Sequence, residues 1–399
     1  MNNPYYILII VSVLIILSYL FNLVSAKIKV PSVILLLLTG VGLQFLAKES
    51  GFDFVGTKLP LELLGIIGLI FIVLEGSLDL KITRKKLPLI GKSFLSALLI
   101  LLATSSLIAL ILIEFVGLTL QIAVVYAVPL GVISSAIAIP SVNKLSEEKK
   151  EFIVYESTFS DIIGIMLFNY IIIGNVTSGS SILSFFINLL LILSISAVST
   201  IILLFLLNYT RTHIKFYLIF AILILIYSIS KMFHLPSLLF ILIFGLMLNN
   251  VDKFIKGKLA NYLHLERLQS VTKELSQITA ETAFIVRTFF FILFGFSINL
   301  ILLNDINVIL IGGLITICIL LTRFIFLRFI SKSNVFPEIF IAPRGLITIV
   351  LFYSIPSHFQ TSYFNEGILF FVIIASSVMM MIGIMSTKTV YDEKLDNLI

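Results

Sequence analysis

The residues of this chain that could do chemistry are charged side chains inside long apolar segments. Glu156 and Asp161 stand five residues apart in the stretch VYESTFSDII. If that stretch enters a bilayer from the cytoplasm near Glu151, a helical rise of about 1.5 Å per residue puts Asp161 about 15 Å deep and Glu156 about 8 Å deep. A charge at the centre of a membrane helix costs about 2.5–3.5 kcal/mol to insert, so such a residue generally has a partner and a task.

Three arginines lie in other apolar segments, at Arg287, Arg323 and Arg344. Counted along their segments, Arg323 and Arg344 lie at depths comparable to that of Glu156, whereas Arg287 lies closer to the depth of Asp161. We therefore expect a structural ion pair between Glu156 and either Arg323 or Arg344. Arg287 is a candidate charge-compensating cation that competes for Asp161.

A carboxylate near the middle of a bilayer can hold a proton or a metal cation, but not both at once. That competition couples two fluxes, which makes Asp161 the candidate ion- and proton-binding residue, with Na⁺ as its metal. Hard cations prefer oxygen ligands, and candidate hydroxyls are Ser157 and Ser160 on the same helix and Ser134 and Ser135 on the preceding one. The alternatives are helix packing for the serines and a polar helix contact for Asp161.

Prolines and glycines predict that two of the apolar segments are interrupted. Pro129 and Gly131 precede the serines in one segment, and Pro343 and Gly345 stand in another. Proline inside a helix breaks the hydrogen-bond ladder, and unwound backbone is tolerated in a membrane where it lines a cavity. The exposed helix ends carry partial charges that an ion or Arg344 can offset. We therefore expect two crossing, broken helices.

The elements that must position these residues are membrane-spanning helices. The chain has 399 residues, of which 59% are apolar and 12% charged, and its mean hydropathy is +1.17. Apolar runs of about 20 residues, the span of a bilayer, recur along its length. They predict an all-α polytopic membrane protein with about thirteen helices, at approximately 5–26, 30–47, 60–80, 88–114, 119–143, 150–174, 181–207, 213–231, 235–250, 276–301, 305–331, 336–356 and 365–387.

The loop charges predict the orientation of this bundle. Loops on one face carry most of the lysines and arginines, whereas those on the other carry only Lys48, Lys58 and Lys231. By the positive-inside rule, the N-terminus lies outside and the C-terminus in the cytoplasm, across the cytoplasmic (inner) membrane of the cell. The net charge of +6 is then a topology signal and does not indicate nucleic-acid binding. The polar stretch 251–275 is expected to be a cytoplasmic amphipathic segment or linker.

Several function classes are excluded by composition. A single cysteine, Cys318, and four histidines without ligand spacing predict no resident metal site. No Ser/His arrangement suggests a hydrolase, so we expect no enzyme and no cofactor beyond the transported cation and H⁺. The chain ends at Ile399, shortly after the last predicted helix, so we expect no soluble nucleotide-binding domain. Such a domain commonly accompanies a potassium efflux system.

The second half of the chain repeats the first, seven segments later. Pro31 and Gly40 return as Pro236 and Gly245 with unchanged spacing. FIVLEGSLDL at 71–80 likewise returns as FILFGFSINL at 291–300, and PLGVIS at 129–134 returns as PRGLIT at 343–348. An odd offset inverts the second copy in the bilayer. We expect one transporter domain over 1–399, with inverted repeats at approximately 5–174 and 213–387 and a linking helix at 181–207, a pattern typical of secondary transporters.

These motifs resemble the monovalent cation:proton antiporter superfamily, in particular its sodium/proton exchanger (NhaP-like) branch. The stretch Glu156 to Asp161 is similar to the family's E-S-x-x-N-D, PRG at 343–345 to its L-R-G, and LEGSLDL at 74–80 to its L-F-E-x-G-L-x-L. The resemblance implies that Asp161 binds ion and proton, and that Glu156 is structural and pairs with Arg323. It further implies that a core of helices 4–6 and 11–13 moves against a dimerisation scaffold, and that the protein is a homodimer.

The chain departs from the family pattern at three places. The family's Thr-Asp-Pro appears as Ser134-Ser135-Ala136, the Asn of its N-D pair as Ser160, and a glutamate of many exchangers as Arg287. A single carboxylate at Asp161 favours electroneutral one-for-one exchange.

We therefore predict an antiporter that exchanges protons for Na⁺, or for Li⁺ or K⁺, by alternating access, with a role in pH homeostasis. Three alternatives stay open. They are a sodium-coupled organic anion transporter on a similar fold, which the three arginines keep in play, a potassium efflux transporter, and a membrane scaffold or receptor.

Overall fold

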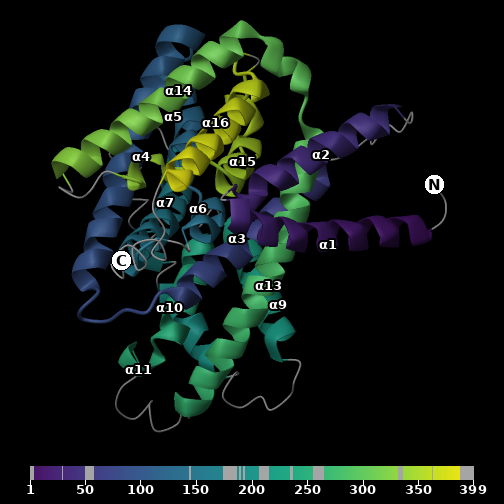
Figure 1. Ribbon diagram of the computed structural model, residues 1–399. Coiled ribbons are helices and arrows are strands. Elements are labelled where there is room, and N and C mark those ends of the chain that lie inside the picture. The colour runs from purple at the N-terminus through teal and green to yellow at the C-terminus, as the bar shows by residue number, and fades with distance from the viewer. Residues whose placement is uncertain are drawn as a thin grey trace, which may run out of the picture.

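The computed structural model is an all-helical bundle (Figure 1). It describes residues 4–28, 30–49, 58–142, 145–173, 187, 190–191, 194–205, 215–233, 237–254, 265–330, 336–361 and 363–386, which contain no strand. Its helices are α1 (Pro4–Ile28), α2 (Ser32–Glu49), α3 (Lys58–Asp79), α4 (Leu87–Val116), α5 (Leu120–Gly131), α6 (Ser135–Ser141), α7 (Glu147–Ile173), α9 (Lys215–Met232), α10 (Ser237–Asn249), α11 (Val251–Phe254), α13 (Leu265–Ser297), α14 (Ile306–Ile325), α15 (Leu346–Tyr353) and α16 (Glu366–Met385). Short turns of other helix types are η1 (Leu300–Asn304), η2 (Phe326–Ile330), η3 (Glu338–Phe340) and η4 (Ser357–Phe359).

The helix count agrees with the sequence prediction. Within the described residues, eight helical segments are long and apolar enough to cross a membrane, with α5 and α6 counted as one. Three shorter apolar helices cover 194–205, 216–232 and 237–249. Together with α7 and the η3–α15 segment, these account for the thirteen predicted segments, and the predicted all-α membrane fold is confirmed.

The helix ends follow from local chemistry. The side chain of Asp305 accepts a hydrogen bond from the Asn307 amide at 2.9 Å and so begins α14, and Asn365 begins α16 in the same way. Such caps satisfy amide groups that a helix leaves unpaired at its first turn. Gly117 ends α4 with a φ of +75°, a left-handed conformation that glycine adopts without strain.

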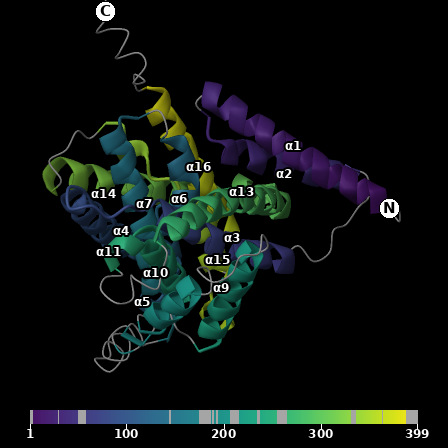
Figure 2. The ribbon, with the colours of Figure 1, turned by 90° about the horizontal axis from the view of Figure 1, so that it is seen from below.

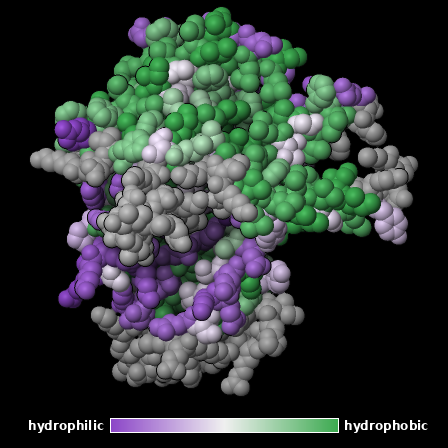
Figure 3. Space-filling model, in the orientation of Figure 1, coloured by the Kyte–Doolittle hydropathy of each residue, from purple (hydrophilic) through white to green (hydrophobic). Residues whose placement is uncertain are grey.

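The surface separates an apolar belt from a polar end. In Figure 3, hydrophobic residues cover the upper part of the face and the arm formed by α1 and α2, whereas hydrophilic residues gather below. In Figure 1 that lower region holds α10, α11 and the first half of α13. Figure 2 also shows α1 and α2 side by side at the periphery. An exposed surface this apolar is what a lipid-facing helix bundle requires.

Two close helix crossings use glycines of the sequence repeat. A Cβ on Gly40 of α2 would collide with the backbone of α13 at Ile292, and a Cβ on Gly245 of α10 would collide with Ser77 of α3. Small residues let membrane helices approach to backbone contact. The two equivalent glycines thus stand at crossings with the two helices that carry the repeated ten-residue motif, α3 and α13.

The two predicted broken helices are present and cross each other. Residues 132–134 are extended between α5 and α6, and residues 341–345 separate η3 from α15. The backbone amide of Ser134 donates to the carbonyl of Pro343 at 2.9 Å, which joins the two breaks. A Cβ on Gly345 would stand 2.6 Å from the Ser134 Oγ atom, so glycine permits this crossing.

Some predicted boundaries were wrong. The helix expected at 276–301 is α13, which begins at Leu265, so the second part of the polar stretch 251–275 is helix. The first residues of that polar stretch form α11, and 255–264 lie outside the described residues. Of the helix expected at 336–356, only η3 and α15 are helical. Polar residues had concealed the first turns of α13, because a helix that extends beyond the membrane no longer needs an apolar surface.

Candidate ion-binding site

Asp161 lies on α7, beside the break between α5 and α6, and its side chain is 2% exposed. Its Oδ2 atom accepts a hydrogen bond from the Ser135 backbone amide at 3.2 Å. Ser135 is the first residue of α6, so this amide is one of the donors that a helix leaves free at its start. The Oδ1 atom is buried and has no hydrogen-bond partner among the described residues. The carboxylate is therefore held on one side and unsatisfied on the other.

The predicted serines divide into two groups. Ser160 accepts a hydrogen bond from the Ile133 amide at 2.9 Å, which ties α7 to the extended segment, and the buried Ser134 Oγ has no partner among the described atoms. Together with Ser135, these residues lie at the break. Ser157 instead donates to the Ile153 carbonyl of its own helix at 2.8 Å, a bond typical of a serine satisfied within a membrane helix.

Glu156 and Arg323 form a fully buried ion pair. The Arg323 Nη2 atom lies 2.7 Å from Glu156 Oε2 and Nη1 lies 3.1 Å from Oε1, and both side chains are 0% exposed. Ser96 of α4 donates to Glu156 Oε1 at 2.5 Å, and Arg323 Nε donates to the Glu338 carbonyl at 2.5 Å. A buried ion pair is stable when it is bidentate and its remaining polar atoms also have hydrogen-bond partners. It joins α4, α7, α14 and η3.

Arg344 holds the end of a broken helix. Its Nε atom donates to the Leu130 carbonyl at 2.7 Å and Nη1 donates to the Ala342 carbonyl at 2.8 Å. Leu130 is the penultimate residue of α5, where a helix end carries partial negative charge. The Arg344 backbone amide donates to Ser376 Oγ of α16 at 3.0 Å. Arg344 therefore offsets a helix end, and Glu156 pairs with Arg323.

Arg287 does not pair with Asp161, in contrast to our expectation. Its Nη2 atom lies 3.4 Å from Oε2 of Glu75 on α3, and its Nη1 donates to the Ala136 carbonyl at 3.5 Å. Depth along the helix was a poor guide to the partner of Arg287, because it ignores lateral position. The packing of α13 places Arg287 against α3 and the first turn of α6, and not against Asp161. Glu75 belongs to the predicted LEGSLDL motif, but its partner could not be read from the sequence.

A cavity of about 390 Å³ reaches this site from one side. Its polar lining includes Glu75 and Asp79 of α3, Ser135 of α6, and Glu281 and Arg287 of α13. Asp161 itself does not line the cavity, but Ser135 both lines it and holds Asp161. An aqueous route therefore comes within one residue of the carboxylate. Among the described residues, no group of three or more His, Cys, Asp or Glu side chains could hold a resident metal.

A family described as "Sodium/hydrogen exchanger, transmembrane" matches residues 10–390, nearly the whole chain. The chain belongs to the sodium/hydrogen exchanger family.

The fold of this exchanger is similar to that of a solved antiporter. The structure of the sodium proton antiporter MjNhaP1 from Methanocaldococcus jannaschii at pH 8 has a TM-score of 0.67 and 20% identity, over 96% of this chain and 99% of that one. A three-dimensional electron microscopy map of the same antiporter gives 0.69 and 18%, over 96% and 95%. At these identities the likeness shows a shared fold alone. No curated protein sequence matches the chain.

Membership settles the protein's class. It is a multi-pass membrane transporter of a family that exchanges monovalent cations and protons. Sequence reasoning found the resemblance and the broken helices that carry the site. It missed Ser96 and Glu338, which complete the buried ion pair. The only signal for these two residues in the sequence was that they are polar residues near apolar segments.

Proposed function

We propose that this exchanger is a secondary active antiporter in which Asp161 binds either a proton or a Na⁺ ion. The observation that carries the proposal is the half-satisfied carboxylate of Asp161. One oxygen accepts the Ser135 amide at 3.2 Å, and the other has no partner in the described structure. A buried carboxylate with a free oxygen is costly unless a proton or a cation occupies it. Either occupant removes the penalty, and one excludes the other.

The ligands proposed for the cation are oxygen atoms at the crossing of the broken helices. Asp161 Oδ1 and the Ser134 hydroxyl are buried and have no hydrogen-bond partner in the described part of the chain, and Ser135 and Ser160 are fixed beside them. We assign Ser157 a supporting role, because its hydroxyl already donates to its own helix. The first coordination sphere of Na⁺ would be completed by water from the cavity that reaches Ser135.

One carboxylate with one exchangeable occupant favours electroneutral transport. The site carries the same charge with H⁺ as with Na⁺, so each direction moves one positive charge. Arg287 does not alter this count while it is paired with Glu75, because arginine stays protonated in proteins. The proposed stoichiometry is therefore one H⁺ for one monovalent cation, with Li⁺ and K⁺ as candidate competitors.

The organic anion alternative has less support. An organic anion would need a cationic side chain directed into the cavity. Of the arginines that kept this alternative open, Arg323 pairs with Glu156, Arg344 is fully buried against carbonyls, and Arg287, which lines the cavity, pairs with Glu75.

We also propose that the N-terminus lies outside and the C-terminus in the cytoplasm of a cell's inner membrane, and that the protein forms a homodimer. The supports are the lysine-rich loops at one end and the peripheral, apolar α1.

Proteoliposomes test the assignment. Purified wild-type protein is expected to exchange internal H⁺ for Na⁺, read with a pH-sensitive dye, and Asp161→Asn is expected to abolish this exchange while eluting as a folded protein. Glu114→Gln, an exposed carboxylate on α4, is the matched control and should retain exchange. An imposed membrane voltage should leave the wild-type rate unchanged. Full activity of Asp161→Asn would refute the assignment, and a voltage-dependent rate would refute the stoichiometry. A set of Na⁺, Li⁺, K⁺ and acetate-type anions separates the exchanger from the alternatives.

A further inference from the structure

Thr348, on the second broken helix, carries a deeply buried hydroxyl. Its side chain is 0% exposed, and its Oγ1 atom has no hydrogen-bond partner among the described residues. In α15, Thr348 is the one polar residue before the terminal Tyr353. A buried hydroxyl that makes no hydrogen bond is destabilising, and an apolar side chain of the same shape would remove that penalty. The hydroxyl is therefore a candidate for binding something other than protein.

The break of the helix explains why this hydroxyl is not satisfied locally. A threonine inside a helix can donate to the carbonyl four residues earlier. Four buried threonines of this chain do so at 2.7–2.9 Å: Thr158, Thr272, Thr316 and Thr322. For Thr348 that carbonyl belongs to Arg344, which lies in the extended segment before α15 and outside its first turn. The same break that exposes the helix end thus leaves the hydroxyl available.

The sequence repeat pairs Thr348 with a proposed cation ligand. PLGVIS at 129–134 aligns with PRGLIT at 343–348, so Thr348 is the equivalent of Ser134. Both side chains are buried, and neither hydroxyl has a partner within the described part of the chain. The substrate site of an inverted repeat lies at the interface of the two halves, between their discontinuous helices. Each half of this chain therefore offers one hydroxyl to such a site.

The crossing of the breaks brings Thr348 toward the ion-binding site. A Cβ on Gly345 would stand 2.6 Å from the Ser134 Oγ atom. Thr348 follows Gly345 by three residues, which places the two Cβ positions about 5–6 Å apart on one face. A helical side chain also leans back toward the N-terminal end of its helix, here toward the break. The Thr348 side chain thus lies on the face of α15 that meets Ser134, whose neighbour Ser135 holds Asp161 at 3.2 Å.

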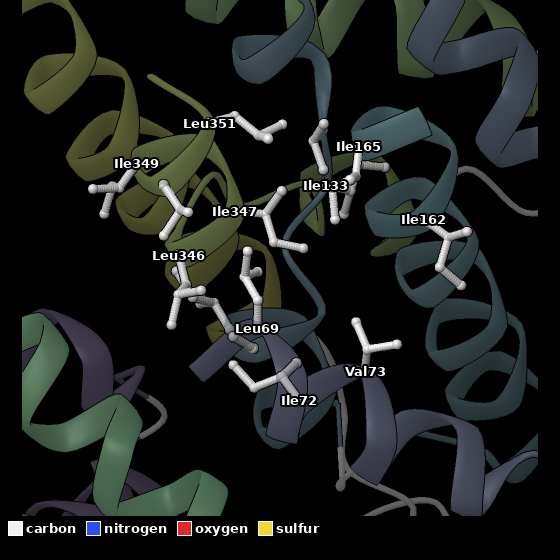
Figure 4. Packing of buried hydrophobic residues seen from close by; sticks show 14 of the residues in the cluster. Leu69, Ile72, Val73, Ile133, Ile162, Ile165, Leu346, Ile347, Ile349 and Leu351 are labelled. Atoms are coloured by element: carbon white, nitrogen blue, oxygen red, sulfur yellow. The ribbon is translucent and has the colours of Figure 1, made fainter. Parts of the chain in front are cut away.

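The surroundings of the crossing are largely apolar. In Figure 4, Ile347 of α15 points toward Ile133 of the first break, beside which lies Ile165 of α7. α15 contacts both α5 and α7, the helix that carries Asp161. A cation among these side chains finds oxygen only at the polar groups of the two breaks and of α7. Electrostatic interactions are stronger in such a low-dielectric setting, so one additional hydroxyl changes the binding of a cation.

We propose that the Thr348 hydroxyl is a further oxygen ligand of the transported cation, supplied by the second broken helix. This proposal deepens the proposed function and rests on it, because the cation is the one that competes with H⁺ for Asp161. Hard cations take several oxygen ligands, whereas a proton needs only the carboxylate. Thr348 therefore sets the affinity for the cation and the choice among Na⁺, Li⁺ and K⁺, and it leaves the affinity for H⁺ unchanged.

Removing the hydroxyl at constant shape tests the proposal. In proteoliposomes, Thr348→Val is expected to raise the half-saturating Na⁺ concentration about fivefold, the effect of losing one typical polar contact. The ratios of the Na⁺ value to the Li⁺ and K⁺ values should change as well, because ions of different size depend differently on one ligand. The proton concentration that doubles the half-saturating Na⁺ concentration should stay as in the wild type. Thr348→Ser keeps the hydroxyl and should restore Na⁺ binding.

The matched control is Thr316→Val on α14. Thr316 is buried as well, but its hydroxyl already donates to the Gly312 carbonyl at 2.7 Å, so its loss should leave the half-saturating Na⁺ concentration unchanged. A wild-type value in Thr348→Val, an equal rise in Thr316→Val, or a Thr348→Ser protein that binds Na⁺ no better than Thr348→Val overturns the proposal. If Thr348→Val does not elute as a folded protein, Thr348→Ala and Thr316→Ala take the places of the two valine variants, and the same outcomes decide.

Stabilisation by Na⁺ measures binding without transport, because a ligand that binds only the folded state raises the melting temperature as its concentration rises. The wild type should respond to Na⁺, Asp161→Asn should not, and Thr348→Val should need about fivefold more Na⁺ for the same response. A wild-type response in Asp161→Asn contradicts the proposed function itself. A response that is lost in Asp161→Asn but unchanged in Thr348→Val overturns only the role of Thr348 and leaves the proposed function in place.

Discussion

Replacing Glu156 with alanine tests the buried ion pair most directly. The change removes a carboxylate that accepts two bonds from Arg323, at 2.7 and 3.1 Å, and one from Ser96 at 2.5 Å, at a place with no solvent exposure. A guanidinium left buried without its partner costs about 3–5 kcal/mol. The unpaired Ser96 hydroxyl adds about 1 kcal/mol. A domain of about 150–250 residues loses about 2–4 °C of Tm per kcal/mol, and a longer chain loses less, so we expect the melting temperature in detergent to fall by about 5–10 °C.

The assay is thermal unfolding of the purified protein followed by size-exclusion chromatography, with exchange measured on the fraction that remains folded. Glu114→Ala removes an exposed carboxylate from α4 and should shift the melting temperature by less than about 1 °C. If the pair is structural, folded Glu156→Ala keeps a half-saturating Na⁺ concentration near that of the wild type. A variant with wild-type stability that no longer binds Na⁺ would falsify this reasoning, because the pair would then act in transport and not in holding α4, α7 and α14 together.

Three further outcomes follow from the site. Under the proposed competition of H⁺ and Na⁺ for Asp161, lowering the pH by one unit should raise the half-saturating Na⁺ concentration by up to about tenfold in the acidic range; a constant value across pH 5–8 contradicts competition. Arg287→Gln removes a positive charge from the cavity and leaves Glu75 unpaired. A unit charge about 10 Å from the ion, at an effective dielectric of about 40, is worth about 0.8 kcal/mol, so the half-saturating Na⁺ concentration should fall about fourfold; an unchanged value in flux titrations rejects this. The hydrogen bond from Lys86 to Glu151, at the polar end, raises the pKa of the Lys86 ammonium above its ordinary 10.5. The stability that this hydrogen bond contributes is present below pH 10.5 and is lost only as pH rises through the higher pKa of the folded state. Lys86→Gln should therefore leave the pH profile of exchange between pH 6 and 9 unmoved. A displaced profile would show that this lysine takes part in pH sensing.

The sequence was sufficient for the number of helices and for the two broken ones. Hydropathy runs are long because each helix must satisfy the bilayer along its whole length, so thirteen segments could be counted before any packing was known. Proline at 129 and 343 breaks a helix by local sterics, whatever surrounds it. The stretch from Glu156 to Asp161 resembles a motif of the exchanger family by its residue pattern, and a charge at that depth is rare without a task.

Which side chains meet was decided only by the tertiary structure. The sequence left Glu156 with two candidate arginines, and packing of α4 against both α7 and α14 brings Arg323 to it. The sequence also offered Arg287 to Asp161, but the lateral position of α13 places it against Glu75, more than 200 residues away in the chain. Depth along a helix follows from counting residues, whereas the partner of a side chain depends on the rotation and neighbours of its helix. For the same reason, the sequence could not show that the Ser135 amide holds Asp161 or that a cavity reaches Ser135. Both follow from the crossing of two breaks that lie far apart in the sequence.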